Sequence, residues 1–202
     1  SDAELGLYTG WLALPWVIKP LWSPFVDLLK TKRWWILLMQ LLIGASLAGI
    51  AFTIPTAVWF QCSMAFFFIM AFASATHDIS ADGFYMIELD EHRQTMFVGI
   101  RNTFYRLAVI FGNGVLVSLA GVLQVLFRNR IAYTWSLLFY GVAGLFIALW
   151  LYHGMRLPRP AGDQQAEGTF KEVADGLVEM FTKFFTKFPL KETVAVMLFL
   201  LL

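Results

Sequence analysis

The feature that most constrains the fold is a run without a single charged side chain, which extends from Trp34 to Thr76. Hydrophobic residues make up 59% of the chain and charged residues only 14%, whereas soluble domains carry about 25% charged residues. The run is long enough for two helices of about 20 apolar residues, the length that crosses a bilayer. The sequence therefore predicts an all-α fold, a polytopic bundle of membrane-spanning helices.

Residues 1–152 hold five predicted spans, which short polar or uncharged turns separate. The spans are expected over residues 5–29, 34–52, 57–87, 95–127 and 131–152. The first span contains Pro15, Pro20 and Pro24. Proline interrupts helical hydrogen bonding, so kinks or local unwinding are expected there, which neighbouring helices can tolerate in a membrane.

Residues 153–189 are too polar to span a membrane, and their second half is amphipathic. Apolar residues recur there at steps of three and four, at Phe170, Val173, Leu177, Met180, Phe181, Phe184, Phe185 and Phe188. This pattern predicts a helix that lies in the membrane surface; the alternative is a solvated helix packed on a soluble part. Residues 190–202 read as the start of another span, so we expect the chain to be a piece of a longer protein.

Basic residues near the ends of spans predict the orientation, because cytoplasmic connections are enriched in Lys and Arg. Such residues gather in the 30–33 loop, at Arg93 and within 153–190, which places these three connections in the cytoplasm. Arg128 and Arg130 fall at the opposite end and contradict the rule. The expected location is the inner (plasma) membrane, crossed several times.

Two carboxylates, Asp78 and Asp82, lie one helical turn apart inside the third span and therefore share one face. In an antiparallel hairpin of the third and fourth spans, equal depth predicts the pairs Asp82–Arg101 and Asp78–Arg106. Buried charges need partners, so two ion pairs could simply lock the hairpin. Alternatively, one carboxylate takes and releases a proton as the protein changes state. His77 points about 100° away from Asp78 and is interpreted as a hydrogen-bonded packing residue, with a proton relay as the alternative.

A second charged residue deep in a span is Lys19, between Pro15 and Pro20. A lysine that faces a cavity suits an anionic substrate, whereas the alternative is a pair with an aspartate on a span that this sequence does not include. The sequence contains no metal-ligand cluster and no nucleotide-binding fingerprint, so no metal and no cofactor are expected. The net charge of +1 does not suggest nucleic acid as a partner.

The segment Ser74-Ala-Thr-His-Asp-Ile-Ser-Ala-Asp-Gly-Phe84 resembles a signature of the AmpG-type muropeptide permeases and the related acetyl-CoA transporters. These proteins form one branch of the major facilitator superfamily. Residues 14–27 are similar to the second helix of that branch, and residues 101–107 are similar to the start of its fifth helix. The glutamine of the signature is His77 in this chain.

The resemblance implies that the five spans are helices 2–6, that residues 153–189 connect two halves, and that residues 190–202 begin helix 7. It implies alternating access around a site between the halves, driven by a proton gradient, with Asp78 and Asp82 as the residues to test. It also implies a conformational gating loop, of which Asp27, Lys32 and Arg33 remain, although a glycine and an arginine of the superfamily pattern are missing.

The resulting hypothesis is a secondary transporter, not an enzyme, that takes up an anionic amphiphilic solute such as an anhydro-muropeptide by proton symport. Lys19 would bind a substrate carboxylate, and Arg101 and Arg106 would partner the aspartates. The expected partners are the bilayer, the solute, protons and the other half of the same protein. The alternatives are a membrane scaffold or sensor that moves no solute, and an integral membrane enzyme that acts on lipid-linked sugars.

Overall fold

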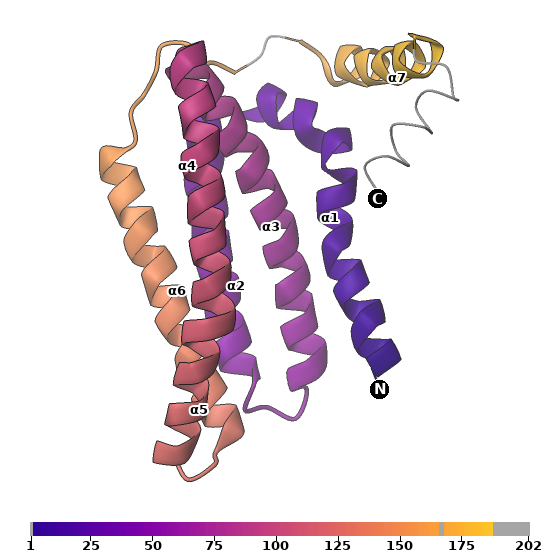
Figure 1. The fold of residues 1–202 in the computed structure, drawn as a ribbon. Helices are drawn as coiled ribbons and strands as arrows, with labels where there is room; N and C mark the ends of the chain where they lie inside the picture. The colour runs from indigo at the N-terminus through magenta and orange to yellow at the C-terminus, as the bar shows by residue number, and fades with distance from the viewer. Residues whose placement is uncertain (1, 166–167, 188–202) are drawn as a thin grey trace.

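The computed structural model describes residues 2–165 and 168–187, and it forms helices joined by short connections there (Figure 1). The helices are α1 (Asp2–Leu29), α2 (Lys32–Thr53), α3 (Trp59–Glu88), α4 (Glu91–Ile110), a π-helix (Phe111–Leu116), α5 (Val117–Leu126), α6 (Ile131–Arg156) and α7 (Phe170–Lys187). The span predicted at residues 190–202 lies outside the described residues.

Five stretches of the described residues are long and apolar enough to cross a membrane, which confirms the all-α, multi-pass fold. They are Gly6–Leu29, Lys32–Thr53, Trp59–Glu88, Glu91–Leu126 and Ile131–Arg156. The fourth is composite, because a π-helical segment joins α4 to α5. It begins at Glu91 rather than near residue 95, since Asp90 caps it by accepting a hydrogen bond from the Arg93 backbone N–H.

The three prolines of the first span lie inside one continuous helix, α1, so the predicted local unwinding is absent. Figure 1 instead shows α1 bending near its C-terminal end. A proline inside a helix removes one hydrogen bond and clashes with the preceding turn, and the backbone relieves the clash by bending. The prolines therefore curve the helix rather than break it.

The packed core lies where α2 meets α3 and α6. Its buried members are Met39, Ile43 and Leu47 of α2, Ala73 of α3 and Ala143 of α6. By contrast, none of the described residues of α4 is buried. The core thus consists of α2, α3 and α6, while α4 lies at the periphery.

Two hydrogen bonds between polar side chains join α2 to its neighbours in the core. Thr53 of α2 shares a hydrogen bond of 3.0 Å with Ser63 of α3. Gln40 of α2 contacts the Nδ1 atom of His153 of α6 at 2.8 Å. Hydrogen bonds of this kind connect helices in a medium where an unpaired polar group would be costly.

Gly49 allows α2 and α3 to approach closely, because a Cβ atom there would lie 2.5 Å from Phe66 Cε1. We expect Gly49→Ala to lower the free energy of unfolding by about 1–3 kcal/mol through overpacking. Gly144→Ala is the matched control, since a Cβ at Gly144 meets nothing within 4 Å. Thermal unfolding in detergent measures both variants, and equal stability of the two would contradict the close approach.

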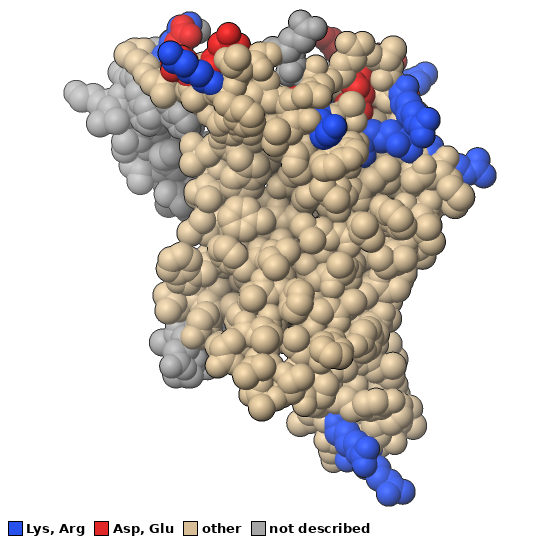
Figure 2. All heavy atoms as spheres, turned by 180° about the vertical axis from the view of Figure 1, so that it is seen from behind, with Lys and Arg blue, Asp and Glu red and all other residues tan. Residues whose placement is uncertain are grey.

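The connections predicted to share one side of the membrane meet at one end of the bundle (Figure 1). These are the turn after α1, the turn between α3 and α4, and the segment after α6. On the face drawn in Figure 2, Lys, Arg, Asp and Glu gather at this end, basic residues alone lie at the opposite end, and the middle is uncharged. The bundle therefore has the charge distribution of a membrane protein.

The amphipathic segment forms the predicted helix, α7, which lies across that same end at a steep angle to the spans (Figure 1). It contacts α1 through the stacked rings of Phe25 and Phe170, whose centroids are 5.5 Å apart. Its placement in the membrane surface stays a prediction.

Candidate functional site

Four charged side chains from three helices form a single group, which we call the charged cluster: Lys19 of α1, Asp78 and Asp82 of α3, and Arg101 of α4. Lys19 Nζ donates a hydrogen bond of 2.6 Å to Asp78 Oδ2. The Arg101 guanidinium donates to both carboxylates, from Nη2 to Asp78 Oδ1 and from Nη1 to Asp82 Oδ1. Asp78 is therefore shared by two cations, whereas Asp82 has Arg101 alone.

The local sequence explains why one arginine reaches both aspartates. Four helical residues correspond to about 400° of rotation, so Asp78 and Asp82 lie within about 40° of each other on α3. The planar guanidinium of Arg101 carries several N–H groups in a fixed fork, which suits two acceptors at once. The spacing of the aspartates and the identity of the cation together produce the bridge.

Aromatic residues of α1 hold Lys19 at the level of Asp78. Trp22 Nε1 donates to Thr76 Oγ1 of α3 at 3.3 Å, and the Trp22 ring packs against Phe72 with centroids 5.4 Å apart. The Lys19 ammonium also lies 5.4 Å from the centre of the Trp16 ring, within the range of a cation–π contact. These contacts fix the position of α1 along α3.

The charged cluster is electrically balanced and only partly enclosed. It holds two cations and two anions, so its net charge is zero when both aspartates are ionised. The side chain of Asp78 is 17% exposed, those of Lys19 and Asp82 are each 30% exposed, and that of Arg101 is 42% exposed. The helices α2 and α6 contribute no member. The cluster therefore retains an accessible side on which another polar group can bind.

The predicted pair of Asp78 with Arg106 is wrong. Arg106 is exposed and makes no ion pair with any described residue, and Lys19 and Arg101 are the partners of Asp78. Arg106 follows Arg101 by five residues, which places it about 140° away around α4. The prediction rests on equal depth in the membrane alone, whereas the rotation of α4 turns Arg106 away from Asp78.

Two further predictions for polar groups have a definite outcome. Lys19 pairs with Asp78 of α3, and not with an aspartate on a span outside this sequence. His77 is largely enclosed, and its buried Nε2 atom has no hydrogen-bond partner among the described residues. The predicted hydrogen bond of His77 is therefore not present at Nε2 among the described residues, and packing alone accounts for the position of that atom.

The residues predicted for the gating loop link four helices at the end of the bundle that carries α7. Lys32 forms an ion pair with Asp27 of α1. Its side chain lies over Gly83 of α3, where a Cβ atom would come within 2.6 Å of Lys32 Cε. Arg33 donates to two carbonyls at the end of α6, from Nη2 to Gly154 at 2.9 Å and from Nε to Leu157 at 3.2 Å.

Sequence reasoning missed Asp163, which closes this network from the connection after α6. Its two carboxylate oxygens accept from the backbone N–H groups of Lys32 and Arg33 at 2.7 and 2.9 Å, so Asp163 caps the start of α2. Gln165 donates to the Leu28 carbonyl at the end of α1 at 2.5 Å. Asp163 lies in a non-periodic segment with no motif, and its role follows only from the tertiary structure.

Comparison with models of known protein families gives a match. The family model described as the BT1 family matches residues 1–200. No curated protein and no solved structure matches the chain.

Proposed function

The chain belongs to the BT1 family of membrane transporters, and from this premise we propose that it takes up an anionic amphiphilic solute together with a proton. The observation that carries the proposal is the charged cluster, in which two aspartates and two cations from three helices are balanced and partly accessible. A balanced cluster of this kind can accept a proton and a carboxylate together without leaving an unpaired charge.

The need for charge balance in the cluster couples proton binding to solute binding. When one aspartate takes a proton, Lys19 and Arg101 face a single carboxylate, and the cluster gains a net positive charge. An unpaired charge in a membrane bundle is costly. A carboxylate from the solute restores the balance, so that the proton and the anion each favour binding of the other.

Asp82 is the proposed proton carrier and Asp78 the structural acceptor. Asp82 has one cationic partner, whereas Asp78 accepts from both Lys19 and Arg101. Nearby positive charge favours the ionised form of a carboxylate, so the aspartate with fewer cations is the one that is easier to neutralise.

Lys19 is the proposed contact for the carboxylate of the solute. Its ammonium group is a compact charge on a flexible stem, and its side chain is 30% exposed. The surrounding rings of Trp16, Trp22 and Phe72 offer an apolar surface to the rest of an amphiphilic molecule. An anhydro-muropeptide combines these properties, and the resemblance of residues 74–84 to the muropeptide permease branch supports this class of solute.

Alternating access requires that the network around residues 27–33 breaks and reforms. Hydrogen bonds of Arg33 and Asp163 join the segment after α6 to the start of α2. We propose that this network closes one end of the bundle in one state of the transport cycle. Residues 153–189 would then connect two halves that move against each other, with residues 190–202 as the start of helix 7.

The test uses the complete protein reconstituted in liposomes, with the interior held more alkaline than the exterior. A radiolabelled anhydro-muropeptide is the first probe, and acetyl-CoA is the second. Accumulation of one probe above its external concentration, dependent on the gradient, supports the proposal. Binding without accumulation would indicate a scaffold or sensor, and chemical conversion of a probe would indicate an enzyme.

Lys19→Ala is expected to weaken the binding of the anionic probe by about tenfold to a hundredfold, because one hydrogen bond between charged groups is lost. Lys30→Ala is the matched control, since Lys30 is exposed on the connection between α1 and α2. Equilibrium binding to the purified protein measures the effect. Unchanged affinity in Lys19→Ala would remove Lys19 from the solute site.

A further inference from the structure

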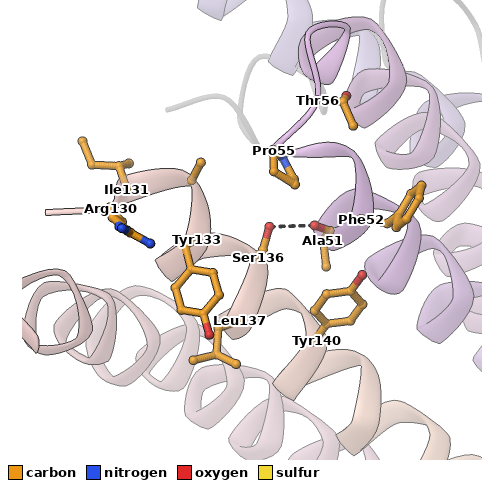
Figure 3. A pocket seen from close by; sticks show the side chains of 11 residues that line it. Ala51, Phe52, Pro55, Thr56, Arg130, Ile131, Tyr133, Ser136, Leu137 and Tyr140 are labelled. Atoms are coloured by element: carbon orange, nitrogen blue, oxygen red, sulfur yellow. Dashed lines mark hydrogen bonds between the residues drawn. The ribbon is translucent and has the colours of Figure 1, made fainter. Parts of the chain in front are cut away.

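A cavity of about 820 Å³ lies between the end of α2 and the start of α6, at the opposite end of the bundle from the Asp163 network (Figure 3). We call it the α2–α6 groove. Its lining is mostly hydrocarbon, including Phe52, Pro55 and Leu137. Ser136 Oγ donates to the Ala51 carbonyl at 2.7 Å, so that hydroxyl is already satisfied and fixes α6 against α2. The groove is therefore an apolar recess between two helices that this hydrogen bond holds together.

Besides Ser136, the polar side chains that line the groove are Thr56, Arg130, Tyr133 and Tyr140. Arg130 lines it, and Figure 3 shows the Arg130 side chain beside Tyr133, on the wall opposite Phe52. Tyr133 and Tyr140 also line the groove, and about half of each tyrosine side chain is exposed. Tyrosine is enriched at the level of lipid headgroups, where its ring is apolar and its hydroxyl is hydrated.

The turn before α6 positions two arginines at this end. Arg128 and Asn129 have φ angles of 52° and 60°, and the Arg130 N–H donates to the Phe127 carbonyl at 3.2 Å. The left-handed conformation is costly for an arginine, although an asparagine tolerates it. Strain of this kind persists where the surrounding structure or a function requires it. Arg128 and Arg130 are also the basic residues that contradict the charge rule for membrane orientation.

Arg128 and Arg130 have no acidic partner in the part of the chain that the structure describes. No ion pair of Arg128 or Arg130 exists among the described residues, and the sequence contains no Asp or Glu from His92 to Gly162 or from Trp34 to His77. Two cations that pair with no described carboxylate thus lie at this end of the membrane spans, and one of them, Arg130, lines the apolar groove.

We infer that the α2–α6 groove binds an anionic phospholipid, with an acyl chain between α2 and α6 and the phosphate at Arg130. A guanidinium group binds phosphate through two parallel hydrogen bonds, and apolar walls replace the lipid neighbours of the chain. Basic sites between transmembrane helices select anionic headgroups in the same way. Arg128 adds a second positive charge, which favours a net negative headgroup over a zwitterionic one.

The test compares two lipids with identical acyl chains on the purified, delipidated protein by native mass spectrometry. Dioleoyl phosphatidylglycerol is expected to bind more tightly than dioleoyl phosphatidylcholine, by about fivefold for each arginine. The double variant Arg128→Gln/Arg130→Gln should bind the two lipids equally. Arg159→Gln, an exposed arginine at the other end of the bundle, is the control and should keep the preference.

A second variant probes the groove itself. Leu137→Trp fills it and should weaken the binding of both lipids. Equal binding of the two lipids by the unmodified protein would overturn the inference, and this comparison does not depend on any variant folding. A preference that survives in the double arginine variant would also overturn it. The inference would also fail if the Leu137→Trp protein bound lipid normally but changed its oligomeric state. The groove would then be a contact between copies of the protein.

Discussion

Asp82→Asn is expected to abolish proton-driven accumulation of the solute while leaving exchange down a concentration gradient. The amide keeps an oxygen that can accept from Arg101 but cannot take up a proton. The charged cluster then holds two cations and one anion at every pH, so the solute carboxylate binds without a proton. With one proton for each singly charged solute, the unmodified protein should accumulate the solute about tenfold for each unit of pH difference.

The measurement is uptake of the radiolabelled probe into liposomes at a series of imposed pH differences. The accumulation ratio should rise with the gradient in the unmodified protein and stay near unity in Asp82→Asn. Glu88→Gln is the matched control, because it makes the same chemical change at an exposed position of the same helix. Gradient-driven accumulation by Asp82→Asn would assign the proton to another group.

Asp78→Ala is expected to have the largest effect on stability. It leaves Lys19 without its ionic partner and removes one of the two acceptors of Arg101. Removing one member of a buried ion pair costs about 3–5 kcal/mol, and the 17% exposure of the Asp78 side chain places the loss near the lower value. Unfolding in detergent should show this loss, and reconstituted protein should transport no solute.

A double-mutant cycle separates the ion pair from other effects of the substitution. Lys19→Met removes the unpaired cation that Asp78→Ala leaves behind. The double variant should therefore be more stable than the sum of the two single losses predicts, by about 1 kcal/mol or more. Strictly additive losses would contradict an energetic coupling between Lys19 and Asp78.

The five spans could be predicted from sequence because the bilayer imposes a simple rule. Each span needs about 20 apolar residues, and polar turns must separate the spans. The periodicity of residues 170–188 likewise identified the α7 helix. The continuity of α1 through three prolines was not predictable, because neighbouring helices decide whether a proline bends or unwinds a helix.

The charged cluster could be predicted only in part. Asp78, Asp82 and Arg101 belong to one helical hairpin. Their positions in the sequence therefore predict that Arg101 lies at the level of the aspartates. The contact of Lys19 with Asp78 depends on how α1 packs on α3, and the facing of Arg106 depends on the rotation of α4. The hydrogen bonds from Lys32 and Arg33 to Asp163 join residues about 130 positions apart. The local sequence therefore does not predict them. The transport roles of these residues stay predictions.

The central claim is that one proton enters with each solute carboxylate through the charged cluster. It is tested most directly by recording solute uptake and internal pH together, in liposomes that contain the complete protein and a pH-sensitive dye. Addition of the external anionic solute should acidify the interior in proportion to uptake, and Asp82→Asn should take up solute without acidification. Solute uptake by the unmodified protein without any proton movement would contradict the account.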